Sequence, residues 1–127
     1  MKVLSGREAS IFACLCDTVV APAPPLPRVA ETDAVDAFDR YLADSPPLNR
    51  LGMRAMVHAA ELAPRALGQP ARLRRLGTTE RAQALARAET SRAKPLVDAL
   101  EFVARLSYFG DDGVMRMLGY DAETRRP

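Results

Sequence analysis

Apolar residues recur at helical spacing along most of the chain, and they are densest between Pro95 and Phe109. At about 100° per residue, this segment forms a helix with one broad apolar face, further apolar residues at its margins and a narrow polar strip. The broad face holds Leu96, Ala99, Leu100, Val103, Ala104 and Leu106, the margins hold Val97, Phe102 and Phe109, and the strip holds Asp98, Glu101 and Arg105. Such a helix needs cover on several sides, so we predict that it is the central member of a helical bundle.

Four further helical patterns precede this segment, and a short one follows it. They cover residues 5–20, 32–43, 45–64 and 78–89, and the last runs from Asp111 or Asp112 to Leu118. The first begins with a capping box, in which Ser5 is the N-cap and Glu8 lies at the third helical position. We predict an all-α fold: a single domain over residues 1–127, with five to six helices around the central C-terminal helix and a frayed tail over 121–127.

Each of the first three patterns has an inner stripe of larger apolar residues, with polar residues such as Asp39 outside it. The stripes are Ile11, Phe12, Leu15 and Val19 in the first, Val35, Phe38, Tyr41 and Leu42 in the second, and Leu48, Leu51, Ala55, Val57, His58 and Leu62 in the third. The fourth pattern has Leu85 as its main anchor and many alanines, which indicates a peripheral helix. Cys14 and Cys16 point to opposite sides of one helix, so we predict that both pack as small apolar residues.

A proline-rich segment over residues 21–30 separates the first two helices. Its four prolines, Pro22, Pro24, Pro25 and Pro27, fix the backbone and remove hydrogen-bond donors. We therefore predict an extended strap of the polyproline type. The strap either spans one end of the bundle or serves as a stiff docking segment that loses little entropy on binding.

Charge is distributed unevenly along a chain whose formal net charge is only +2. Residues 64–94 carry eight basic side chains and two acidic ones, and the basic residues Arg72, Arg74 and Arg75 lie almost together. Such a region suits an acidic protein surface. It does not suit nucleic acid, because no predicted helix carries polar residues for reading bases and the aromatic residues lie in apolar stripes.

Membrane insertion is not expected, because no apolar run approaches the roughly 18 residues that a spanning helix needs. The first ten residues carry charge where a signal peptide would need its apolar core. The chain as given is therefore expected in the cytoplasm. A composition of 48% hydrophobic and 27% charged residues is that of an ordinary globular protein.

Catalytic and cofactor-binding patterns are largely missing from the sequence. We find no Ser/His/Asp set, no histidine-rich metal pattern and no glycine-rich phosphate loop, and we predict no catalytic, metal-binding or cofactor-binding residue. His58 is the only histidine, with Arg54 and Glu61 one helical turn away on either side. An alternative is that His58 and Tyr41 are the polar groups of a cavity that binds a small ligand or performs a reaction.

Three short motifs carry a resemblance to a known family. They are L-S-G-R-E at Leu4–Glu8, C-D-T-V-V-A-P at Cys16–Pro22, and Y-F-G-D-D-G-V-M-R-M-L-G-Y at Tyr108–Tyr120. With them, the chain resembles the gluconate 2-dehydrogenase subunit 3 family, the small subunits that accompany flavin-dependent dehydrogenases of the glucose-methanol-choline type. The order of helix, proline break, arginine-rich turn and helix in the middle of the chain is also similar.

The resemblance implies a noncatalytic accessory subunit that binds a larger flavin-dependent oxidoreductase and helps it to fold or be exported. FAD is then expected on the partner and no cofactor on this chain. Family members commonly carry a twin-arginine export signal, which is not seen before the first capping box here. The partner-binding residues that charge and stiffness predict are Pro22, Pro24, Pro25, Pro27, Arg72, Arg74 and Arg75, and a homodimer is a further alternative.

Overall fold

The computed structural model describes residues 2–66, 68–69 and 71–117, and these residues form helices and loops without a β-strand. The helices are α1 (Gly6–Val20), α2 (Ala34–Ala43), α3 (Pro47–Ala66), α4 (Thr78–Glu89), α5 (Lys94–Phe109) and α6 (Asp112–Met117), with the 3-10 turns η1 (Val29–Glu31) and η2 (Leu73–Arg75). The predicted all-α fold is confirmed, and the observed bounds lie within two residues of the predicted ones. The predicted tail at 121–127 lies outside the described residues.

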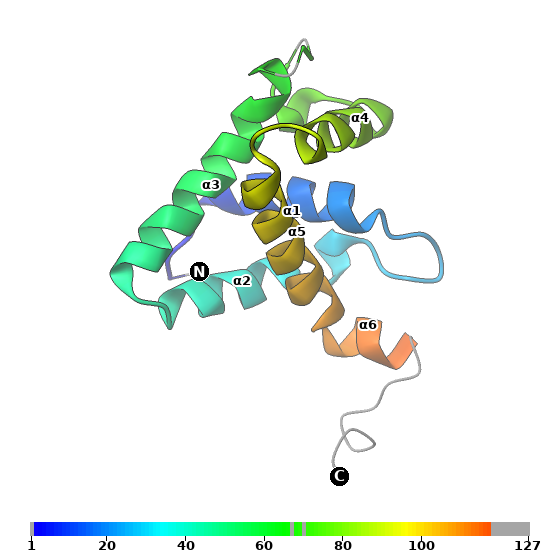
Figure 1. The fold of residues 1–127 in the computed structure, drawn as a ribbon. Helices are drawn as coiled ribbons and strands as arrows, with labels where there is room; N and C mark the ends of the chain where they lie inside the picture. The colour runs from blue at the N-terminus through cyan, green and yellow to red at the C-terminus, as the bar shows by residue number, and fades with distance from the viewer. Residues whose placement is uncertain (1, 67, 70, 118–127) are drawn as a thin grey trace.

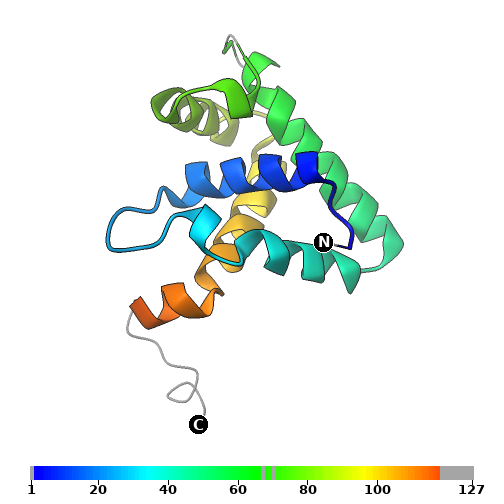
Figure 2. The same cartoon turned by 180° about the vertical axis from the view of Figure 1, so that it is seen from behind.

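Helix α5 is the hub of the bundle, because it contacts each of the other five α-helices. It crosses in front of α1 in Figure 1 and behind α1 in Figure 2, so these two helices form adjacent layers. The core between them includes Phe12, whose ring stacks on that of Phe38 with centroids 4.0 Å apart. The predicted central position of the C-terminal helix is therefore confirmed.

The start of α1 follows the predicted capping box. The Ser5 hydroxyl accepts the amide of Glu8 at 3.1 Å, and the Glu8 carboxylate accepts the amide of Ser5 at 2.9 Å. Further along α1, Cys14 and Cys16 are both buried, free thiols within the apolar core, as predicted. Burial raises the pKa of both thiols, which keeps them protonated and unreactive.

The proline-rich segment is a turn, so the prediction of an extended strap is wrong. The Pro24–Pro25 peptide bond is cis, and the amide of Leu26 donates to the carbonyl of Ala23 at 2.9 Å, which closes the chain on itself. The loop is anchored to α5, because the buried Tyr108 hydroxyl donates to the Pro27 carbonyl at 2.6 Å. Composition could not predict the isomer of one peptide bond in this segment.

Helix α3 buries a different face from the predicted one. Its buried residues are Met53, Val57, Glu61 and Pro64. Of the predicted inner residues, Val57 is buried as expected, whereas Leu48, Leu51, Ala55 and Leu62 are exposed. The pattern was ambiguous because leucine, methionine and alanine occur on both faces of this helix. The residues that are buried repeat every three to four positions from Met53, as expected for one face of a helix.

Helix α5 also differs from its prediction, since its buried face is rotated by about a quarter turn from the expected one. The buried residues are Leu100, Glu101, Ala104, Ser107 and Tyr108. Phe102 and Leu106 lie on the outer side and are 65% and 64% exposed. Apolar residues surround most of this helix, so the pattern alone could not show which side its neighbours cover.

Candidate functional site

Glu8 ties the start of α1 to the middle of α3. Its carboxylate accepts hydrogen bonds from the Arg54 guanidinium at 3.1 Å and lies 3.0 Å from His58 Nε2. Burial alone would raise the pKa of Glu8, but the hydrogen bonds from Arg54, the Ser5 amide and His58 outweigh it and lower the pKa to about 2. Glu8 is therefore an anion at neutral pH and acts as a structural anchor.

The cluster around His58 differs from the one that helical spacing suggested. Its carboxylate partner is Glu8 from another helix, whereas Glu61 faces η2. Tyr41 is half-exposed on α2, and its hydroxyl accepts the side-chain amide of Asn49 at 3.3 Å. The apolar cavity described below is lined by neither His58 nor Tyr41. Nothing in their surroundings assigns the pair a reaction, and their role as polar site residues stays a prediction.

Glu61 holds the arginine-rich turn against α3. The backbone amide of Arg74 donates to one oxygen of this buried carboxylate at 3.0 Å, and its guanidinium donates to the other. Burial acts to raise the pKa of Glu61, but these bonds lower it. Arg74 is thus engaged within the fold. Of the three arginines predicted to meet a partner, Arg72 and Arg75 are the exposed ones.

Asp39, predicted to lie on the outside of α2, is instead a buried anchor for the N-terminal segment. Its carboxylate accepts the backbone amides of Lys2, Val3 and Leu4 at 2.8, 3.0 and 2.8 Å. Burial acts to raise the pKa of Asp39, but the three amides lower it. The helical pattern marked Asp39 as polar and could not reveal donors that lie more than 30 residues away in sequence.

An apolar groove runs along the outer side of α5. Phe102, Leu106 and Phe109 line it, with Asp98 and Arg105 among its polar residues. Among the described residues, no other element covers the side chains of Phe102 and Leu106. Large aromatic and aliphatic groups in this arrangement are typical of surfaces that bind other proteins.

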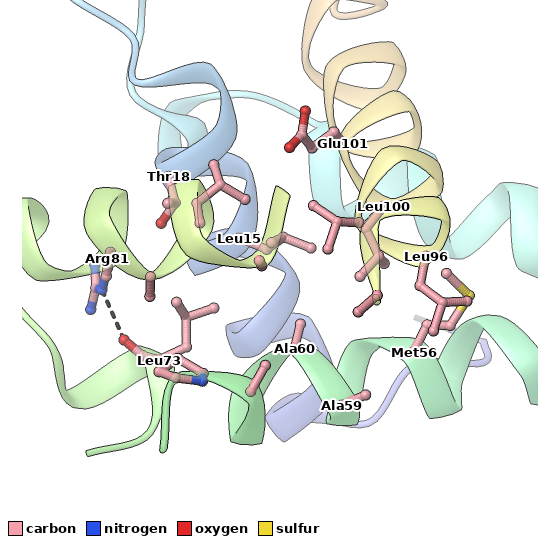
Figure 3. A pocket seen from close by; sticks show the side chains of 17 residues that line it. Leu15, Thr18, Met56, Ala59, Ala60, Leu73, Arg81, Leu96, Leu100 and Glu101 are labelled. Atoms are coloured by element: carbon pink, nitrogen blue, oxygen red, sulfur yellow. Dashed lines mark hydrogen bonds between the residues drawn. The ribbon is translucent and has the colours of Figure 1, made fainter. Parts of the chain in front are cut away.

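A second hollow lies on the inner side of α5, between this helix and α1, α3 and α4 (Figure 3). Its volume is about 120 Å³. The wall is almost entirely apolar and includes Leu15, Met56, Ala60, Leu73, Ala84, Leu85, Ala88, Leu96 and Leu100. Its polar members are Thr18, Arg81 and Glu101. The helical pattern does not reveal this cavity, and its one signal in the sequence is the run of alanines in α4 and in the second half of α3.

The described part of the chain contains no group of three or more histidine, cysteine, aspartate or glutamate side chains placed to hold an ion. No helix among the same residues is long and apolar enough to cross a membrane. Comparisons with protein-family models, with curated proteins and with solved structures find no match for this chain. The resemblance drawn from the sequence motifs therefore stays a prediction.

Proposed function

We propose that this chain is a noncatalytic accessory subunit that binds a larger flavin-dependent oxidoreductase of the glucose-methanol-choline type and stabilises or matures it. The observation that carries the proposal is the apolar groove on the outer side of α5, which the described residues leave uncovered. Phe102 and Leu106 each leave about two thirds of their surface in solvent, although the helix they belong to is the hub of the fold.

Two further features support a role in binding. The groove combines aromatic and aliphatic side chains with charged neighbours, Asp98 and Arg105, which is the composition of a protein interface with an apolar centre and a polar rim. The motif at Tyr108–Tyr120, which carries much of the family resemblance, begins at the end of the same helix. The flavoprotein partner itself is inferred from that resemblance.

The direct test is affinity capture of the flavoprotein with tagged chain from a native extract. The retained material is expected to be a larger protein that shows the absorbance of oxidised flavin, in a fixed ratio to the chain. Capture of a protein without flavin would contradict the proposal, as would stoichiometric flavin or turnover on the isolated chain.

The role of the groove is tested with Leu106→Ser, which is expected to reduce capture of the flavoprotein at least about tenfold, because central apolar contacts dominate most interfaces. Leu48→Ser is the matched control, since Leu48 is 81% exposed on α3 and lies outside the groove. Both substitutions are at exposed positions and should change the free energy of unfolding by less than about 0.5 kcal/mol. Equal capture by the two variants would exclude the groove as the contact.

A further inference from the structure

We infer that the cavity between α1, α3, α4 and α5 is a binding site for a small, mostly apolar molecule. The molecule carries one cationic or hydrogen-bond-donating group, and the carboxylate of Glu101 accepts a hydrogen bond from this group. This inference goes beyond the proposed function, because it concerns the cavity on the inner side of α5 and does not depend on the flavoprotein. Glu101 lines this cavity and also borders the outer groove. The inference rests on the shape of the cavity and on the hydrogen bonding of Glu101.

The cavity owes its space to small side chains where the helices face one another. Ala59, Ala60 and Ala63 of α3 and Ala84 and Ala88 of α4 all line it. Leucine at such positions would fill the gap between helices, whereas a methyl group leaves it open. The resulting volume of about 120 Å³ is similar to that of an engineered apolar cavity of about 150 Å³ that binds benzene. The site therefore fits a molecule about as large as one aromatic ring.

The mouth of the cavity lies beside exposed residues at the start of α5. Ala93 and Leu96 line the cavity and are both exposed, and Ala59 is their exposed counterpart on α3. In Figure 3, Met56 and Leu96 lie next to each other at one side of the cavity, between α3 and α5. A small molecule can thus enter between these two helices without separating the core.

Glu101 differs from the other buried glutamates and from Asp39 in its hydrogen bonding. Both carboxylate oxygens of Glu8, of Asp39 and of Glu61 accept hydrogen bonds. Glu101 is only 6% exposed, and Arg105 pairs with its Oε2 at 3.2 Å. Its Oε1 is buried and has no hydrogen-bond partner among the described residues. A buried carboxylate oxygen without a donor is costly, so a bound donor at this position would be favourable.

The other two polar groups of the wall, Thr18 and Arg81, are already engaged within the fold. The Thr18 hydroxyl donates to the Cys14 carbonyl at 2.9 Å, which leaves its oxygen able to accept. In Figure 3, Thr18 is drawn closer to Arg81 than to the Glu101 carboxylate. Arg81 lies on the α4 side, and it donates to two backbone carbonyls, at Leu73 and at Arg74. The free carboxylate acceptor in the described part of the wall is therefore Glu101 Oε1, and a ligand would place its ammonium or hydroxyl group there.

The test is a titration of the full chain with three probes of equal ring size, followed by protein-observed NMR. The probes are benzylamine, which is a cation at neutral pH, toluene, which is neutral, and benzoate, which is an anion. We expect saturable binding with benzylamine tightest and benzoate weakest, and chemical-shift changes at the residues that line the cavity. Benzylamine should bind at least about tenfold more tightly than toluene, as expected for a charge-assisted hydrogen bond in a buried site.

Two variants separate the roles of charge and space. Glu101→Gln should reduce the affinity for benzylamine about tenfold and leave that for toluene within about twofold. Its matched control is Asp98→Asn, which makes a similar change on the same helix at a residue that does not line the cavity. Ala60→Leu should abolish binding of all three probes, with far-UV circular dichroism showing that the helices remain.

The inference is overturned by any one of three results. The first is that no probe binds saturably to the wild-type chain, a result that does not depend on the folding of any variant. The second is that toluene binds as tightly as benzylamine. The third is that folded Ala60→Leu binds the probes as the wild type does, which would place them elsewhere. Loss of flavoprotein capture without loss of probe binding would affect the proposed function alone.

Discussion

Glu8 offers a quantitative test of the structure, because its hydrogen bonds link folding to pH. The lowering of its pKa from 4.5 to about 2 corresponds to about 3 kcal/mol of stability at neutral pH, since one unit of pKa is worth about 1.4 kcal/mol. The Glu8 side chain is only 3% exposed, but its partners Arg54 and His58 are half-exposed, so we expect about 2 kcal/mol in practice. Because the folded pKa lies below the unfolded one, this stability is present above about pH 4.5 and is lost as the pH falls towards about 2.

The perturbation is Glu8→Gln, which keeps the shape of the side chain and its place in the capping box but removes its charge. Urea unfolding followed by circular dichroism should show the variant about 2 kcal/mol less stable than the wild type at neutral pH. The difference should shrink through the acidic range and disappear near about pH 2. A difference that stays constant over this range, or none at neutral pH, would refute the assigned role. Glu80→Gln, at an exposed position of α4, is the control and should lower the free energy of unfolding by less than about 0.5 kcal/mol.

Three further predictions concern packing and the N-terminal segment. Asp39→Ala should lower the free energy of unfolding by about 2–4 kcal/mol, because it leaves three backbone amides without their acceptor. Amide hydrogen exchange should become faster at residues 2–4, and unchanged exchange there would contradict this contact. Val57→Ala should lower the free energy of unfolding in urea by about 2 kcal/mol, whereas Leu51→Ala should lower it by less than about 0.5 kcal/mol. The reverse order would show that Leu51, and not Val57, faces the core. Both cysteines should react with Ellman's reagent only after unfolding, because they are buried and their thiols are protonated; rapid reaction of the folded chain would show otherwise.

Features set by local sequence could be predicted well. The start of α1 follows from Ser5 and Glu8, which need only each other. The helix ends follow from residues that favour caps and breaks, and the burial of both cysteines follows from their spacing and chemistry. In each case the determining residues lie within one or two helical turns.

Features set by contacts between distant segments could not be predicted. Asp39 and Glu101 have the spacing of surface residues, and only the assembled bundle shows that donors surround the first and that a cavity lies beside the second. The faces of α3 and α5 were misassigned because both helices carry apolar residues on more than one side. Periodicity identifies a helix, but when apolar residues are this abundant it does not give the direction of the core.

The hub position of α5 has a consequence for the whole molecule. The outer groove and the inner contacts belong to one 16-residue helix. A protein bound to the groove would therefore stabilise the helix that all the other α-helices contact. Such a companion binds only the folded chain and raises its melting temperature in proportion to the logarithm of its own concentration. Heating the chain beside increasing amounts of a candidate companion would therefore report association without any label.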